Sequence, residues 1–127
     1  MKVLTAQQTR QLLANGTATK QALEQGLEPP DHKPVVKLFT AAGACTWLLT
    51  ELDPDEPDIA FGLCDLGMQC PEIGSVSMAE LTEARDRLGL PIERDMWFEA
   101  KAGLSSYARA ATRAGRIVEH LEQEGAL

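Results

Sequence analysis

The sequence predicts an α+β fold, an antiparallel meander sheet of about four strands flanked by N-terminal, middle and C-terminal helices. Three observations predict it. Segments with the residue pattern of β-strands follow one another with short turns between residues 35 and 64, which favours antiparallel pairing of neighbouring strands. Sequence signals of helices occur before these segments and at two places after them. The length of 127 residues is typical of one domain that needs no disulfide or metal. We therefore expect a single domain 1–127, with a helical segment and Pro-rich linker at 1–33 and an α+β core at 34–127.

Two short helices are predicted before the sheet. Thr5 suits the N-cap of the first helix, and Gly16 stands where a left-handed C-cap belongs. A second helix is expected from about Thr17 to Gly26. Residues 27–34 read "LEPPDHKP", and because prolines cannot donate backbone hydrogen bonds, this segment is predicted to be an extended linker.

The strands are predicted from β-branched, aromatic and alternating apolar residues. Residues 35–39 read "VVKLF", and "TAAGA" after them supplies the small residues of a turn. Residues 45–52 and 59–66 alternate with a period of two, as a strand with one buried face does. A further strand is expected over 92–98, "IERDMWF".

Two more helices are predicted downstream. Ser77 and Glu80 form an S-x-x-E capping box that opens a helix over about 78–88, which Gly89 and Pro91 end. The last helix is expected over 105–123, with an apolar seam on one side. The seam consists of Tyr107, Ala111, Ala114, Val118 and Leu121, and the basic stripe opposite it consists of Arg109, Arg113, Arg116 and His120. This stripe is either an ordinary solvated face or a second interface, and contact with the acidic sheet of another copy would give an isologous homodimer.

Hydropathy, the start of the chain and cysteine usage together predict a cytoplasmic protein. No apolar run approaches the roughly 20 residues that span a bilayer, so no membrane association is expected. The start "MKVLTAQQTRQLL" lacks the apolar region of a signal peptide. The three cysteines are odd in number and show no C-x-x-C spacing, which is typical of reduced, packed thiols.

The net charge of −7 comes from the middle of the chain. Residues 38–84 contain nine acids and no Lys, Arg or His, whereas the flanking segments are nearly balanced. Such a field repels nucleic acid and attracts cations or basic surfaces, so a protein partner with a basic surface is expected and direct nucleic-acid binding is not. Simple solubility is the other interpretation.

The stretch "TELDPDEPDIAFGLCDLG" concentrates this charge. The Asp-Pro pattern of residues 53–58 is typical of a turn between strands. Three interpretations of this segment stay open: a solvated turn, a negative contact surface and a metal site. The calcium-loop spacing fails at Pro57, whereas Mg²⁺ held by Asp53 and Asp58 remains an alternative. The candidate partner-binding residues are Glu51, Asp53, Asp55, Glu56, Asp58 and Asp65.

Catalytic chemistry is weakly indicated, and we predict no catalytic residue and no cofactor. No G-x-S-x-G elbow, phosphate-binding loop or zinc-ligand spacing occurs. Pro57-Asp58 with Glu99-Ala100-Lys101 spells the letters of a metal-dependent nuclease, with Asp58 and Glu99 as metal ligands. About forty residues separate the two halves, and a nuclease needs positive charge to approach a polyanion.

Several blocks resemble one family. "HKPVVKLF", "TWLLTELDPDEPDIAFGLCDLG", "PEIGSVSMAEL", "LGLPIERDMWF" and "LSSYARAA" are similar, in this order, to the domain of unknown function 2958. The family carries no established activity or catalytic residue, and its members occur on bacterial plasmids and integrative conjugative elements. The resemblance therefore implies a non-enzymatic acidic binding protein of a mobile genetic element, with inhibition of host defence (anti-CRISPR or anti-restriction) as its role. The alternatives are an Mg²⁺-dependent hydrolase and an oligomeric accessory protein of conjugation.

Overall fold

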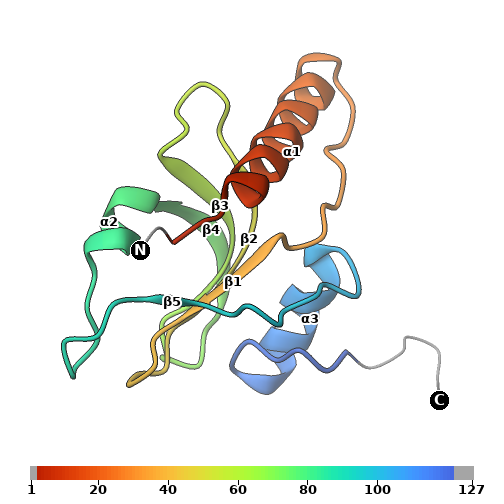
Figure 1. The fold of residues 1–127 in the computed structure, drawn as a ribbon. Coiled ribbons are helices and arrows are strands. Elements are labelled where there is room, and N and C mark those ends of the chain that lie inside the picture. The colour runs from red at the N-terminus through yellow and green to blue at the C-terminus, as the bar shows by residue number, and fades with distance from the viewer. Residues whose placement is uncertain (1–2, 122–127) are drawn as a thin grey trace.

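A computed structural model describes residues 3–121 as a five-stranded antiparallel sheet with helices on both faces (Figure 1). The strand order is β4-β3-β2-β1-β5, so the first four strands form a meander. This confirms the α+β class and the antiparallel sheet. The elements are α1 (Ala6–Glu24), β1 (Val36–Phe39), β2 (Thr46–Leu52), β3 (Ile59–Asp65), β4 (Glu72–Ser77), α2 (Met78–Glu83), β5 (Glu93–Arg94) and α3 (Leu104–Ala114).

The N-terminal region forms one helix, so the prediction of two is wrong. Thr5 is the N-cap as expected, and its side chain and that of Gln8 form a reciprocal capping box. Gly16 is not a C-cap: it is buried inside α1, and a Cβ there would lie 1.8 Å from the carbonyl oxygen of Leu52. The glycine lets the helix backbone approach the end of β2, which is why it stands in the middle of a helix.

The strand prediction holds for β1 to β3 and fails at both edges. β4 was missed because "EIGSVS" contains a glycine and small polar residues, yet it pairs with β3 over six consecutive residues. The strand predicted over 92–98 shrinks to the two residues of β5. It ends there because the Asp95 carboxylate accepts a hydrogen bond from the Trp97 N–H and turns the chain.

Both later helices are shorter than predicted. Ser77 caps α2, but the helix ends at Glu83, where the guanidinium of Arg85 donates to the last carbonyl groups. α3 ends at Ala114 because Gly115 adopts the left-handed conformation, with φ of 76°. The predicted continuation to residue 121 is therefore wrong, and residues 122 and 123 lie outside the described range.

Two hydrophobic clusters hold the layers together. On one face, Leu12 of α1 and Leu81 of α2 join Val36, Leu38 and Trp47 of the sheet. On the other face, α3 packs through Leu104, Tyr107 and Ala111 against Leu48 and Leu63. A β-bulge between Leu49 and Glu51 shifts the alternation at the end of β2. Within residues 3–121, no helix combines the length and apolar character needed to cross a bilayer.

Candidate functional site

The acidic loop, residues 53–58, connects β2 to β3 and is held by its own hydrogen bonds. The Asp53 carboxylate accepts from the Asp55 N–H at 2.9 Å, which is an Asx turn. The Asp53 N–H donates to the Ile59 carbonyl, and the Glu56 N–H donates to the Asp53 carbonyl. Asp53, Asp55, Glu56 and Asp58 are all exposed. The backbone therefore holds four carboxylates at one end of the sheet.

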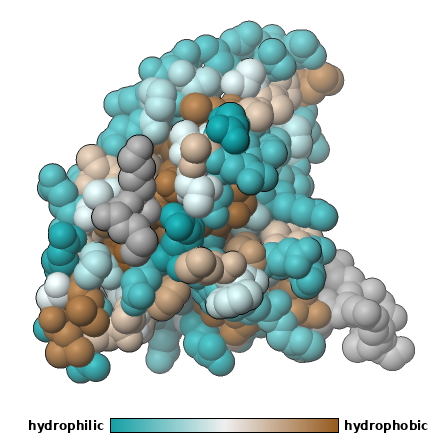
Figure 2. All heavy atoms as spheres, viewed as in Figure 1, coloured by the Kyte–Doolittle hydropathy of each residue, from teal (hydrophilic) through white to brown (hydrophobic). Residues whose placement is uncertain are grey.

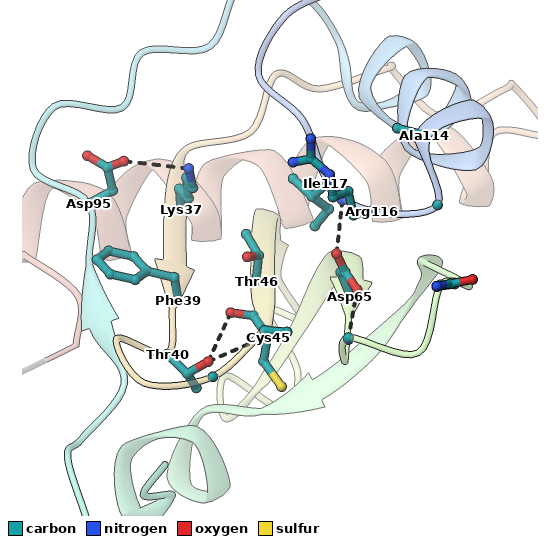
Figure 3. Close-up of a pocket in the computed structure, with 15 residues that line it drawn as sticks. Lys37, Phe39, Thr40, Cys45, Thr46, Asp65, Asp95, Ala114, Arg116 and Ile117 are labelled. Atoms are coloured by element: carbon teal, nitrogen blue, oxygen red, sulfur yellow. Dashed lines mark hydrogen bonds and ion pairs between the residues drawn. The ribbon is translucent and has the colours of Figure 1, made fainter. Parts of the chain in front are cut away.

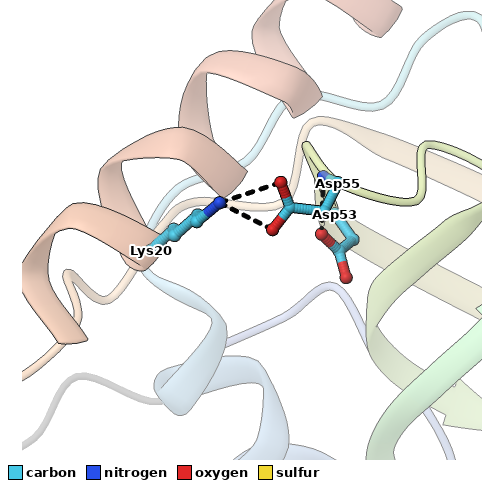
Figure 4. Close-up of polar contacts among 3 residues, drawn as sticks. All are labelled: Lys20, Asp53 and Asp55. Atoms are coloured by element: carbon cyan, nitrogen blue, oxygen red, sulfur yellow. Dashed lines mark hydrogen bonds and ion pairs between the residues drawn. The ribbon is translucent and has the colours of Figure 1, made fainter. Parts of the chain in front are cut away.

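One cation reaches this loop from α1. Lys20 Nζ lies 2.6 Å from one carboxylate oxygen of Asp55 and 2.8 Å from the other (Figure 4). The hydrogen bond to Asp55 raises the pKa of Lys20 above its ordinary value, although partial desolvation opposes the rise. Of the four loop carboxylates, only that of Asp55 has an ion pair with another described residue.

Asp58 has a structural role beside its charge. Its two carboxylate oxygens accept from the Ser77 hydroxyl at 2.7 Å and from the Ala79 N–H at 2.8 Å. These bonds join the acidic loop to the first turn of α2, where Glu80 follows directly and is exposed. The acids at this end of the sheet thus come from two segments that are distant in sequence.

Glu51 lies half-buried beside the loop. It accepts a hydrogen bond from the Thr19 hydroxyl at 3.0 Å, and the same hydroxyl lies 3.0 Å from Nε2 of His32. Desolvation raises the pKa of Glu51, while the Thr19 bond and the nearby His32 oppose this rise.

A groove of about 570 Å³ lies beside these residues, between α1 and the strands β2, β3 and β4. α1 contributes Thr19, Lys20 and Leu23 to its lining, and the sheet contributes Glu51, Phe61 and Ser75. The groove lining therefore combines apolar side chains, such as Leu23 and Phe61, with the carboxylates of Glu51 and Asp55.

Asp65 lies away from the other predicted contacts. Its exposed fraction is 3%, and it stands at the opposite end of β3. Its oxygens accept from the backbone N–H groups of Gly67 and Ile117, each at 2.9 Å (Figure 3). The carboxylate joins β3 to the segment after α3 and is not accessible to a partner.

A second cavity, of about 750 Å³, lies next to Asp65 between the sheet and the end of α3 (Figure 3). Lys37 contributes to its lining, and its ammonium lies 2.6 Å from Glu119 and 3.7 Å from Asp95. Arg116 also lines this cavity. Because acids offset Lys37, the cavity is not a simple anion site.

The predicted basic stripe is not continuous. Arg109 and Arg113 are on α3, whereas Arg116 and His120 follow the helix end at Gly115. Arg113 and His120 still border one small pocket with Val118. In the seam, Tyr107 and Ala111 are buried, but Ala114 is exposed.

The described residues contain no group of three or more His, Cys, Asp or Glu side chains that could hold a metal ion. Asp58 already accepts two hydrogen bonds, and Glu99 is an exposed residue between β5 and α3. These placements give the Asp58–Glu99 metal site no support.

Exposed apolar side chains were missed by the sequence reasoning. Figure 2 shows brown residues over the segment between α2 and β5, where Leu88 is 70% exposed, among mostly hydrophilic neighbours. Trp97, predicted as part of a strand, is 92% exposed. Phe61 on β3 and Ile73 on β4 are also exposed, and β4 is an open edge of the sheet. The sequence of β4 does not indicate a strand. An exposed apolar surface at this edge of the sheet therefore could not be predicted from the sequence.

Comparison with known proteins finds one match. A family model described as "Protein of unknown function (DUF2958)" matches residues 3–118. Searches of curated proteins and of solved structures find no match.

Proposed function

This chain belongs to the DUF2958 family of proteins of unknown function, and from that premise we propose that it is a non-enzymatic acidic binding protein whose partner is a basic, nucleic-acid-handling protein. The observation that carries the proposal is the acidic loop. Its four carboxylates are exposed, and only Asp55 has an ion pair with another described residue. A loop whose shape is set by its own hydrogen bonds presents charge at little cost in conformational entropy.

The charge distribution supports a partner of positive sign. Residues 38–84 contain no Lys, Arg or His, and they form three adjacent strands and α2. The proposed contacts are Asp53, Asp55, Glu56 and Asp58, extended by Glu80, with Glu51 at the edge of the groove. We leave Asp65 out because it is buried. Nucleic acid itself is disfavoured by the same field.

The resemblance to proteins of plasmids and integrative conjugative elements supplies a biological setting for this contact. In that setting the partner is a subunit of a CRISPR or restriction system, and the protein inhibits it in the cytoplasm by presenting carboxylates where phosphates bind. The alternatives, a Mg²⁺-dependent hydrolase and an oligomeric accessory protein of conjugation, have weaker support from the contacts of the described residues.

The test is affinity capture from a bacterial host, followed by affinity measurements with the recovered protein. A Glu56→Lys/Glu80→Lys variant reverses two exposed acids whose side chains make no hydrogen bond to other described residues. We expect it to lose at least tenfold in affinity, and we expect the salt dependence of binding to weaken. The measurement is isothermal calorimetry at two NaCl concentrations.

The matched control is Glu93→Lys/Glu99→Lys. It changes the net charge by the same amount, at exposed acids outside residues 38–84. Equal losses of affinity in the two double variants would mean that net charge, and not the acidic end of the sheet, attracts the partner.

A further inference from the structure

The outer edge of β4 is an unpaired sheet edge with the features of a docking strand. β4 is the last strand in the order β4-β3-β2-β1-β5, so no strand among residues 3–121 lies along its second side. It contains no proline or lysine, and it pairs with β3 without a bulge. Native proteins commonly protect such edges with one of these devices.

The register identifies the backbone groups that face outward. The Met78 N–H donates to the Asp58 carbonyl at 2.8 Å, one step beyond the Ile59–Ser77 pair of the ladder. Hydrogen-bonded and non-hydrogen-bonded pairs alternate in an antiparallel ladder. Ile73 and Ser75 therefore occupy non-hydrogen-bonded pairs, and their N–H and C=O groups point away from β3.

The side chains beside this edge form an apolar surface. Ile73 pairs with Leu63, and Ser75 pairs with Phe61, so these residues share one face of the sheet. Ile73 is 48% exposed and Phe61 is 38% exposed. Phe61 and Ser75 also line the groove beside α1, which is open to alternate side chains of an added strand.

Charge determines what occupies the edge. β4 begins at Glu72, and at its other end the Ser77 hydroxyl donates to Asp58, with Glu80 following in α2. No base lies between residues 38 and 84 to offset them. Two antiparallel copies of β4 would bring Glu72 of one copy toward Asp58 of the other, which like-charge repulsion disfavours.

We propose that the β4 edge accepts an extended basic segment of a protein partner, which adds a sixth strand to the sheet. Ile73 and Ser75 supply the backbone hydrogen bonds, and the groove takes the apolar side chains of the segment. The sign of the partner's charge rests on the proposed function, whereas the strand addition does not.

The test pans phage-displayed random dodecapeptides against the full chain and measures the affinity of the enriched peptides after synthesis. We expect alternating apolar and basic residues. Ser75→Pro removes one outward N–H and no bond to β3, so it is expected to weaken binding at least tenfold. Ser75→Ala, the matched control, is expected to bind within about twofold of the wild type.

A test on the peptide side does not depend on the folding of the proline variant. Methylation of alternate backbone nitrogens is expected to abolish binding in one alternation only, because a β-strand donates to its neighbour from every second residue. Equal effects of the two alternations would overturn the strand addition.

The outcomes separate the two proposals. Peptides that bind Ser75→Pro as well as the wild type overturn the edge inference, and the proposed function survives if the same peptides lose affinity for Glu56→Lys/Glu80→Lys. Loss of affinity in Ser75→Pro alone supports the edge and counts against the electrostatic proposal. Failure to enrich any basic peptide overturns the inference. A dimer that Ser75→Pro dissociates, measured by sedimentation, overturns it in favour of a second copy.

Discussion

At the scale of single residues, a carboxylate in the sequence is not the same as a charge on the surface. The six acids predicted as contacts occupy different environments. Asp65 is buried between two backbone N–H groups, Glu51 is half-buried, and Asp55 is paired with Lys20. Asp58 accepts hydrogen bonds from the N-cap residue of α2, Ser77, and from the Ala79 N–H in its first turn. The acids of this region can be counted from the sequence, but the burial and hydrogen bonding of each one depend on segments far away in the chain, such as Ile117 for Asp65.

Glu51 permits a prediction about pH. Its pKa in the folded protein is raised above the ordinary value of 4.5, so the native state binds more protons than the unfolded state between these two values. The free energy of unfolding contributed by Glu51 therefore falls as pH rises through this window. Glu51→Gln keeps an oxygen for the Thr19 hydroxyl and removes the charge. We expect it to raise the free energy of unfolding at pH 7 by at most about 1 kcal/mol, because water screens a half-exposed group.

The measurement is urea unfolding of both proteins from pH 3 to pH 8. The difference between them is expected to vanish below about pH 4, where Glu51 is protonated in both states. A variant that is less stable than the wild type at pH 7 would show that the hydrogen bond from Thr19 to the charged carboxylate, together with its other favourable contacts, outweighs desolvation.

At the scale of elements, local signals identified where helices begin better than where they end. The capping residues Thr5 and Ser77 were read correctly, because a cap is a contact between neighbours in sequence. Gly16 and β4 were misread. A glycine serves equally as a C-cap or as a close-contact residue, and only the position of Leu52 distinguishes these roles. β4 is held by its pairing with β3, which a short polar sequence does not reveal.

The close contact at Gly16 predicts a reversal of the usual helix rule. Replacing glycine by alanine inside a helix normally stabilises it by about 1 kcal/mol. Here the added Cβ meets the Leu52 carbonyl oxygen, so we expect Gly16→Ala to lower the free energy of unfolding by about 3 kcal/mol. Thr17→Ala, at the next and exposed position of α1, is expected to change it by about 0.5 kcal/mol in the stabilising direction. Urea unfolding measures both, and a stabilised Gly16→Ala variant would contradict the packing of α1 on β2.

At the scale of the whole molecule, an uneven distribution of charge along the chain becomes an uneven distribution in space. Residues 38–84 contain no basic residue and form the adjacent strands β2, β3 and β4. The acids of these strands therefore have no basic side chain beside them within this part of the sheet. The two ends of these strands differ, however. The acidic loop and Glu80 gather at one end, and the buried Asp65 lies at the other.

Repulsion within this acidic end predicts that salt stabilises the protein. Raising NaCl from 0.02 to 0.3 M is expected to increase the free energy of unfolding by about 0.5–1 kcal/mol, because screening weakens the interaction among exposed carboxylates. Glu56→Lys/Glu80→Lys is expected to lose most of this increase. Glu93→Lys/Glu99→Lys has the same net charge and is expected to keep the increase. Loss of the increase in both variants would show that the effect depends on net charge alone. Urea unfolding at each salt concentration distinguishes these outcomes.

The extended segment before β1 ties the first part of the chain to the last helix. The Asp31 carboxylate accepts hydrogen bonds from the N–H and hydroxyl of Ser105, and the Leu104 N–H donates to the His32 carbonyl. During synthesis on the ribosome, the acceptor oxygens of Asp31 and His32 have no donor until residues more than seventy positions later are made. The native packing is therefore completed only after α3 has been synthesised, and until then the apolar face of the sheet that α3 covers remains exposed.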